Sequence, residues 1–153
     1  MKKIIAILLI LVMAFCLIAC EEAVDPTAEF PSMNKLNISS SYKGNKEGNF
    51  FTFSFNWKED ETHSATFCHD YDLYWAMDEM GPFEFCEPIA GYTESTELYT
   101  LVPGEKQEFS VNIDDKYDGL PAGYYRFVFK FNVSIDGGEE EVYSASVDFD
   151  MSI

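Results

Sequence analysis

The chain alternates apolar and polar side chains from about residue 33 to its end. A period of two is typical of β-strands with one buried face, because successive side chains of a strand point to opposite sides. No segment shows convincing helical periodicity. The pattern predicts seven or eight short strands. Six of them have apolar positions of equal parity, which are Leu36, Ile38 and Tyr42; Phe51, Phe53, Phe55 and Trp57; Tyr71, Leu73, Trp75 and Met77; Phe109, Val111 and Ile113; Tyr125, Phe127, Phe129, Phe131 and Val133; and Tyr143, Ala145, Val147, Phe149 and Met151. The others are a segment with Phe83 and Phe85 and a short strand from Leu98 to Val102.

Turn residues separate these strands. A hairpin across Lys43 to Gly48 is expected between the first two strands, and Asp78 to Pro82 forms a later tight turn. Pro103-Gly104 suits a type II bend, because glycine tolerates the positive φ of its second central position. Single-faced strands at this regular spacing predict an all-β fold, with two antiparallel sheets packed as a Greek-key sandwich. A closed barrel is the alternative architecture.

The N-terminal segment has a different pattern. Two lysines follow Met1, and an unbroken apolar run of sixteen residues extends from Ile4 to Ala19. This run is shorter than the roughly 20 residues that a membrane-spanning helix needs, so it predicts a cleaved export signal. Its end, Leu17-Ile18-Ala19-Cys20, resembles the lipobox of bacterial lipoproteins. The resemblance implies cleavage before Cys20 and attachment of lipid to that cysteine.

These features divide the chain into three parts. Residues 1–19 are the expected lipoprotein signal peptide, and residues 20–32 are the lipidated cysteine with a flexible tether. Residues 33–153 form one domain of about 120 residues, a common size for a single hydrophobic core. Since two or more acyl chains anchor a protein stably, the expected location is the cell membrane, with the domain on its extracytoplasmic side.

Charge narrows the choice of partners. Without the two lysines of the signal, eight basic residues stand against 27 acidic ones, a formal net charge of −19. So acidic a surface repels nucleic-acid phosphates and anionic lipid head groups, and no nucleic-acid partner is expected. It is typical of a solvated surface, and any charged partner should be cationic.

Three motifs between Thr66 and Phe149 carry a second resemblance. They are Tyr71-Asp72-Leu73, Leu101-Val102-Pro103-Gly104-Glu105 and Leu120-Pro121-Ala122-Gly123-Tyr124-Tyr125-Arg126. As a set they resemble the immunoglobulin-like domains of lipoproteins and surface proteins from Firmicutes-type bacteria. The Pro-Gly-Glu turn and the following Gly-x-Tyr strand are also similar, more faintly, to the small proteinase inhibitors of bacilli.

The first resemblance implies roles for two residues. Gly123 would allow a positive φ at the turn, and Tyr125 would act as a tyrosine corner that ties the sandwich edge to the backbone. The alternative for Tyr125 is a plain core aromatic. Unlike antibody domains, the chain has no cysteine pair in its second and long strands, where Phe53 and Phe129 occupy core-facing positions.

Cys68 and Cys86 are the thiols left in the domain, and such a pair in an exported protein suggests a disulfide. The strand register opposes it. A hairpin centred on Glu79-Met80 places Cys86 opposite Leu73, five residues from Cys68, which is too far for a bond at about 3.3 Å per residue. A bulge, or a turn centred on Met77, would restore the disulfide, so both states stay open.

Catalytic and metal-binding patterns are weak. Neighbours on a strand point to opposite faces, so Cys68 and His69 do not form a nucleophile–base pair. The acidic run before Gly119 faintly resembles a calcium loop, but Lys116 stands at a ligand position, and a solvated turn is expected instead. No metal, cofactor or catalytic residue is predicted. The residues that contain metal-ligating atoms without a metal-site spacing are His63, Cys68, His69, Asp70 and Asp72, and those of the acidic run are Asp114, Asp115 and Asp118.

We therefore expect a cell-surface lipoprotein whose immunoglobulin-like domain binds an unknown protein or glycan without catalysing a reaction. Loops and exposed sheet edges are the expected contact surfaces. The alternatives are an inhibitor of secreted proteases and a structural spacer.

Overall fold

The computed structural model describes residues 29–33, 35–58, 63–135 and 138–151. The expected signal peptide, Cys20 and most of the expected tether lie outside these residues. In the described part of the chain, nine strands form two antiparallel sheets. A short 3-10 helix, η1 (Ile113–Asp115), directly follows the seventh strand. The predicted all-β sandwich is confirmed. The alternative of a closed barrel is wrong, because the strands divide between two sheets with separate edges.

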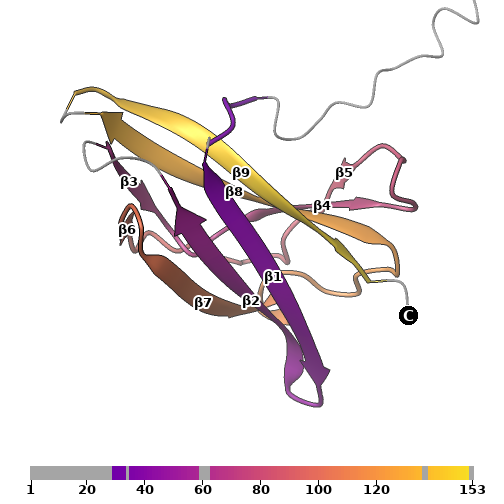
Figure 1. The fold of residues 1–153 in the computed structure, drawn as a ribbon. Helices are drawn as coiled ribbons and strands as arrows, with labels where there is room; N and C mark the ends of the chain where they lie inside the picture. Colours follow the sequence, from indigo (N-terminus) through magenta and orange to yellow (C-terminus); the bar gives the residue numbers. More distant parts are fainter. Residues whose placement is uncertain (1–28, 34, 59–62, 136–137, 152–153) are drawn as a thin grey trace, which may run out of the picture.

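One sheet lies in front of the other, and the strands of the two sheets run at an angle to each other (Figure 1). The three-stranded sheet has the order β1-β2-β7, with β1 at Leu36–Asn45, β2 at Gly48–Trp57 and β7 at Lys106–Asn112. The six-stranded sheet has the order β5-β4-β8-β3-β6, and β9 pairs along β8 as well. Its strands are β3 at His63–Phe67, β4 at Asp72–Ala76, β5 at Glu84–Phe85, β6 at Tyr99–Leu101, β8 at Tyr124–Ile135 and β9 at Glu140–Asp150.

Aromatic rings fill the space between the sheets. The ring centroids of Phe53 and Phe129 are 4.9 Å apart, and those of Phe55 and Phe129 are 5.1 Å apart, both with edge-on geometry. Such tilted pairs are the favourable arrangement for aromatic quadrupoles. Both sheets supply this core through side chains of one parity, as the alternation predicted. The fully buried members with the largest side chains are Trp57, Tyr117, Tyr125, Phe51, Phe53, Phe55, Phe67, Phe127, Phe129, Phe131, Leu73 and Leu101.

One strand was missed by the sequence pattern. β3 runs from His63 to Phe67, where only Ala65 and Phe67 are buried, so its alternation is too short to stand out. β3 and β4 pair with the same strand, β8, with four residues (68–71) between their last and first partners and only two (129–130) opposite them. The chain therefore bulges between β3 and β4, which re-aims the side chains of residues 68–71.

The predicted hairpins need small corrections. The ladder between β1 and β2 continues to the pair Asn45 and Gly48, so the first turn is shorter than the expected Lys43 to Gly48. Met77, expected on the buried face of the third predicted strand, lies beyond the end of β4 and is 77% exposed. At Pro103-Gly104 the expected bend is present, since Gly104 has φ +81° and the Glu105 N–H donates to the Val102 carbonyl at 3.2 Å.

The chain joins the sheet before the expected start of the domain at residue 33. Ser144 of β9 donates its N–H to the Pro31 carbonyl at 2.9 Å, and Met33 donates to the Ser144 carbonyl at 2.8 Å. Met33 itself is buried. Residues 31–33 thus cover part of the outer edge of β9 and end the tether at the sheet.

Candidate functional site

The loop between β4 and β5, residues 77–83, forms the surface that we call the hairpin tip. Met77 is 77% exposed and Met80 is 94% exposed. The loop is closed by its own polar groups, because the Asp78 carbonyl accepts the Gly81 N–H at 3.1 Å and Asp78 Oδ1 accepts the Met80 N–H at 3.0 Å. The tip is therefore an ordered turn that presents two methionines to solvent.

The register of this hairpin agrees with the sequence prediction. Tyr74 pairs with Phe85, and Trp75 pairs with Glu84, which places the centre of the turn between Glu79 and Met80. A hydrogen bond of 2.8 Å from the Cys86 N–H to the Leu73 carbonyl continues the same register. The apolar residues of the tip consequently stand at the far end of the hairpin, away from the core.

Apolar surface continues from the tip onto the outer face of the six-stranded sheet. Phe85 is 44% exposed, and its ring lies 5.4 Å from that of Tyr74. The Arg126 guanidinium lies 4.4 Å from the centroid of the Phe83 ring. Arg126 also donates to both carboxylate oxygens of Asp148, at 2.7 and 2.8 Å, so its charge is compensated within the protein.

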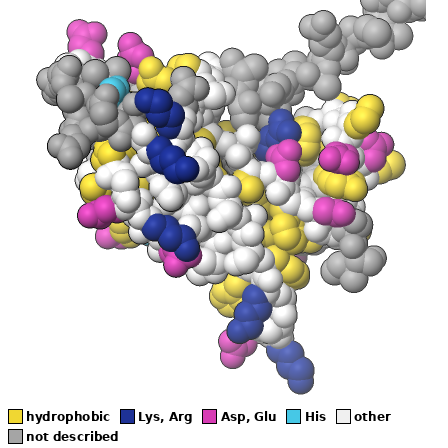
Figure 2. All heavy atoms as spheres, viewed as in Figure 1, with side chains coloured by type: hydrophobic (Ala, Val, Ile, Leu, Met, Phe, Trp, Pro, Cys, Tyr) yellow, Lys and Arg dark blue, Asp and Glu magenta, His cyan; other side chains and the backbone are white. Residues whose placement is uncertain are grey.

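The surroundings of the tip are acidic. Figure 2 shows hydrophobic and acidic side chains interleaved at the right of the molecule, where Figure 1 places β4 and β5. The pKa of the Tyr124 hydroxyl is raised, first by the charge of Asp150, then by desolvation and by Glu79 and Asp78. A pocket of about 160 Å³ adjoins the tip and is lined by Glu79, Phe83, Tyr124, Asp148, Phe149 and Asp150. A ligand that docks here meets apolar contact area in a negative field.

A second surface feature lies where β6 approaches β7. The imidazole of His69 stacks between the rings of Tyr99 and Phe109, at centroid distances of 3.7 and 4.1 Å and nearly parallel. Gln107 Nε2 donates to the Thr100 carbonyl at 2.5 Å, which joins the two strands. Burial lowers the pKa of His69, and the charge of Glu97 partly opposes that effect. Both faces of the imidazole are therefore occupied, and the three rings line a surface pocket of about 330 Å³.

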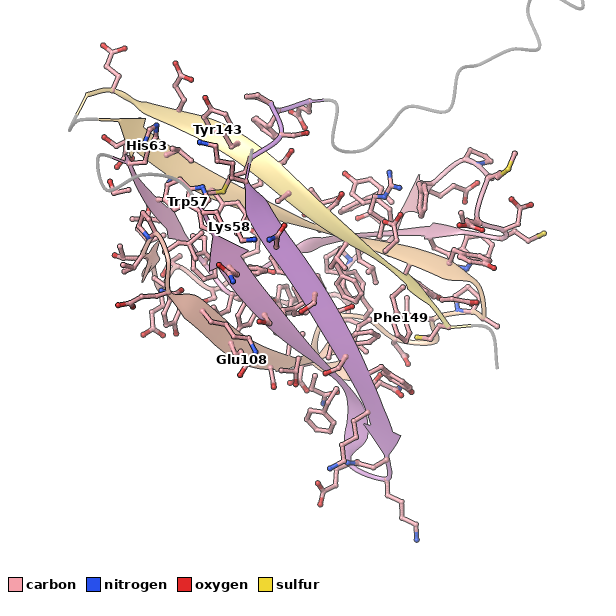
Figure 3. The ribbon with its side chains drawn as sticks, viewed as in Figure 1. Trp57, Lys58, His63, Glu108, Tyr143 and Phe149 are labelled. Carbon is pink, nitrogen blue, oxygen red and sulfur yellow. The ribbon has the colours of Figure 1, made fainter. Side chains whose placement is uncertain are left out.

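The five residues considered for a metal site do not form one cluster, although Cys68, Asp70 and Asp72 line the same small pocket. The ring of His63, labelled in Figure 3, lies edge-on to that of Trp57 at 6.2 Å, and His69 belongs to the stack described above. Asp70 pairs with Lys116, and Asp72 Oδ2 accepts from Lys130 Nζ at 2.9 Å. Among the described residues, no group of three or more His, Cys, Asp or Glu side chains could hold a metal ion.

The expected solvated turn near residue 116 is wrong in one respect. Asp114, Asp115 and Asp118 belong to the acidic run, but Lys116 is only 3% exposed and Tyr117 only 2%. The physical reason is that η1 redirects the chain after β7, and Lys116 is then buried with its ammonium group against Asp70. No periodicity reveals this, because a lysine within an acidic run is normally solvated.

The two domain cysteines are separate free thiols in the structure. Cys68 lies in the bulge between β3 and β4, whereas Cys86 follows β5. Burial, and secondarily the charge of Glu84, raises the pKa of Cys86 to about 11. The thiolate fraction of Cys86 at neutral pH is therefore small, and its thiol should react slowly.

Gly123 and Tyr125 lie at the entry to β8. Gly123 has φ +152°, and a Cβ at this position would lie 2.4 Å from Trp75 Nε1 and 2.7 Å from the Ala76 carbonyl oxygen. The Tyr125 hydroxyl donates to the Pro121 carbonyl, and the residue is 1% exposed. Tyr125 is thus both a core aromatic and a link from the sheet to the preceding turn.

The fold and surface define an all-β sandwich in which the two most exposed large apolar side chains of the described residues, Met77 and Met80, lie on a hairpin tip in acidic surroundings. No known family model matches the chain, and no curated protein is similar to it in sequence. Within the described residues, no helix has the length and apolarity to span a membrane.

Proposed function

We propose that this chain is a cell-surface lipoprotein whose immunoglobulin-like domain binds a protein segment that is both cationic and apolar. The hairpin tip is the contact surface, and the domain catalyses no reaction. The observation that supports this most is the pair of exposed methionines, Met77 and Met80, in acidic surroundings. Flexible, polarisable methionines are well suited to binding surfaces that adapt to a partner.

Charge complementarity favours this partner over others. An apolar patch alone would accept any apolar surface, but the carboxylates of Asp78, Glu79 and Asp150 around the patch repel anionic groups. Arg126, which contacts the Phe83 ring of the tip, is already paired with Asp148. Lysine or arginine beside an apolar side chain would satisfy both properties of the surface. A neutral glycan offers neither positive charge nor a large apolar face, so we propose a protein partner.

The location rests on the N-terminal sequence. An apolar run that ends in Leu17-Ile18-Ala19-Cys20 and is followed at once by Glu21-Glu22 supports cleavage and lipidation at Cys20. The chain already pairs with the sheet at residue 31. A short tether would then keep the domain close to the membrane, where it meets proteins of the cell envelope or its exterior.

Site-specific photo-crosslinking on intact cells tests the contact surface. A photoreactive residue at position 80 should capture a protein partner. The same residue at position 98 is the control, because Leu98 is also well exposed, at 63%. It should capture nothing, since Leu98 lies in the loop before β6 and not on the hairpin tip. The captured peptide should be rich in lysine or arginine. Its yield should fall as the salt concentration rises, because salt screens the attraction between exposed charges.

A charge-neutralised variant sharpens the same test. Asp78→Asn combined with Glu79→Gln removes two negative charges, while the new amide at position 78 keeps an oxygen that can accept the Met80 N–H and close the turn. Capture at position 80 should be weaker in this variant. Equal capture at positions 80 and 98, or an acidic captured peptide, would reject the proposal.

Protease inhibition is the second candidate, and the projecting tip is the feature that favours it. An ordered loop with an exposed side chain at its apex can enter a protease cleft, as Met80 would. Incubation of the purified protein with a panel of secreted proteases distinguishes the two candidates. Stoichiometric inhibition that is lost in Met80→Asp, with Leu98→Asp as the matched control, would favour the inhibitor.

A further inference from the structure

β9 forms one edge of the six-stranded sheet, and most of that edge is open. Within the described residues, β9 pairs with β8 alone among the strands. Residues 31–33 cover its outer side only around Ser144. From Ser146 to Asp150, no described strand is hydrogen-bonded to that side. An uncovered strand edge is a place where an extended segment of another chain can add as a further strand.

Hydrogen bonds near its middle and its end show which backbone groups of β9 face outward. Ser144 bonds to residues 31–33, away from β8, whereas the Met151 N–H donates at 2.8 Å to the residue that precedes β8. The backbone groups of successive strand residues point to opposite sides, so the even-numbered residues of β9 face outward. Ser146 and Asp148 are exposed, and each directs an N–H and a C=O away from β8, where no backbone group of a described residue pairs with them.

The chain's own N-terminal segment shows that this edge accepts an added strand. Residues 31–33 run parallel to β9, with hydrogen bonds of 2.9 Å from the Ser144 N–H and 2.8 Å to the Ser144 carbonyl. The segment leaves the edge soon afterwards, because β1 begins at Leu36 in the other sheet. The backbone groups of β9 beyond Ser144 therefore stay open.

Two hollows adjoin β9 at the ends of this open edge. The first, of about 230 Å³, lies between residues 144–146 and β1. The second is the pocket of about 160 Å³ at the hairpin tip, which residues 148–150 share with Glu79 and Phe83. A strand added along the open edge would reach both hollows, so the edge continues the contact surface proposed above.

The two faces of β9 along this edge differ in polarity. On the solvent face, Asp150 lines the tip pocket together with Glu79. On the core face, Val147 and Phe149 are partly buried, and the ring of Phe149, labelled in Figure 3, lies 5.5 Å from that of Tyr42. Side chains directly opposite one another on paired strands share a face. An added strand that fits this edge therefore carries basic side chains on one face and apolar side chains on the other, which is an alternating sequence.

A second copy of the chain is a poor occupant of the edge. Two β9 edges side by side would bring acidic side chains of both copies together, and like charges on neighbouring strands are destabilising. Without its expected signal, each copy also has a formal net charge of −19, which adds a general repulsion. Charged residues at open edges are a common means of preventing such self-pairing. A cationic segment of another protein avoids both kinds of repulsion.

We propose that an extended segment of the partner protein adds to the outer edge of β9 as a further strand, paired with Ser146 and Asp148. Its basic side chains lie on the solvent face beside Asp150 and Glu79, and its apolar side chains lie on the core face beside Phe149. The charge of this partner rests on the function proposed above, whereas the mode of binding goes beyond it. Backbone hydrogen bonds supply affinity in such pairing, and the alternation of side chains supplies specificity.

Amide hydrogen exchange of the full chain in phosphatidylcholine nanodiscs tests the pairing. The probe is a short peptide of alternating lysine and valine, and its control has the same composition with all lysines before all valines. The alternating peptide should slow exchange at Ser146 and Asp148, while Val147 and Phe149, whose N–H groups face β8, should exchange slowly with or without it. The control peptide has the same charge but cannot place lysine and valine on opposite faces, so it should protect these amides much less.

Three outcomes of this measurement would overturn the proposal. Equal protection by the two peptides would show that charge alone governs binding. Binding of the alternating peptide without protection of Ser146 and Asp148 would place it elsewhere on the protein. Protection that appears without peptide as the protein concentration rises would assign the edge to a second copy.

A matched pair of proline variants tests the same edge. Ser146→Pro removes an N–H that points outward and leaves the ladder with β8 intact, so it should weaken binding of the alternating peptide about tenfold, the equivalent of one backbone hydrogen bond. Ser40→Pro is the control on the edge of β1. The Lys58 N–H donates to the Lys35 carbonyl, so odd-numbered residues of β1 bond to β2 and the Ser40 N–H points away from it. Equal affinities of the two variants would contradict the proposal.

Photo-crosslinking on intact cells separates this proposal from the proposed function. Capture of a partner from position 80 tests the function. If Ser146→Pro captures that partner as well as the wild-type chain does, the strand pairing is wrong and the proposed function stands. If the wild-type chain captures nothing from position 80, the proposed function is wrong, and the exchange measurement with the two peptides still decides the pairing.

Discussion

The tie between Tyr125 and the turn before β8 has a measurable energetic consequence. Tyr125→Phe removes only the hydroxyl that donates to the Pro121 carbonyl and leaves a ring of the same shape in the core. A hydrogen bond of this kind contributes about 0.5–1.5 kcal/mol to stability. We expect the free energy of unfolding to fall by about 1 kcal/mol, which corresponds to a decrease in Tm of roughly 4 °C for a domain of this size.

Tyr117→Phe is the matched control. The Tyr117 hydroxyl is also buried, but it has no hydrogen-bond partner among the described residues. Its removal relieves an unsatisfied polar group, so stability should stay the same or rise. Urea unfolding of both variants, followed by tyrosine and tryptophan fluorescence, gives the comparison. If Tyr125→Phe unfolds at the wild-type urea midpoint, or if Tyr117→Phe is the less stable of the two, the interpretation of Tyr125 as a corner residue is refuted.

Three further predictions concern a turn, a thiol and the N-terminus. Gly123→Ala should lower the free energy of unfolding by about 2–4 kcal/mol, because the new Cβ would collide with Trp75 and the Ala76 backbone at a position of positive φ. Gly119→Ala is the control and should cost only about 1 kcal/mol, because the space around Gly119 is open. Equal urea midpoints for the two variants would contradict this prediction. Stability should decrease as the pH rises above about 9. The unfolded chain loses the thiol proton of Cys86 near the ordinary pKa of 9.0, whereas the pKa of Cys86 in the folded protein is about 11. Unfolding curves of Cys86→Ala at alkaline pH should therefore depend less on pH than those of the wild type. Mass spectrometry of the mature N-terminus should find lipid on Cys20, and a Cys20→Ala variant that still carries lipid would contradict the assignment.

Local pattern was sufficient for most of the sheet architecture. The parity of Phe51, Phe53 and Phe55 predicted a buried face that the structure confirms, because side-chain direction in a strand depends only on position. The turn centred on Glu79 and Met80 was also predicted correctly. Proline, glycine and aspartate favour turns through their own backbone preferences, which do not depend on the rest of the fold. The same local rules placed Met77 on a buried face, and they failed there because β4 ends at Ala76.

The features that matter most for function depended on contacts between distant segments. The sequence by itself determined an all-β chain, its strand faces and turns, and a strongly acidic surface, because these follow from residue type and spacing. Only the tertiary structure decided that β3 and β4 share β8 as their partner with a bulge between them, and that Lys116 meets Asp70 across 46 positions. Periodicity specifies which side of a strand is buried, but the identity of the partner is set by how the sheets pack, and that packing brings a buried amine to a buried carboxyl group.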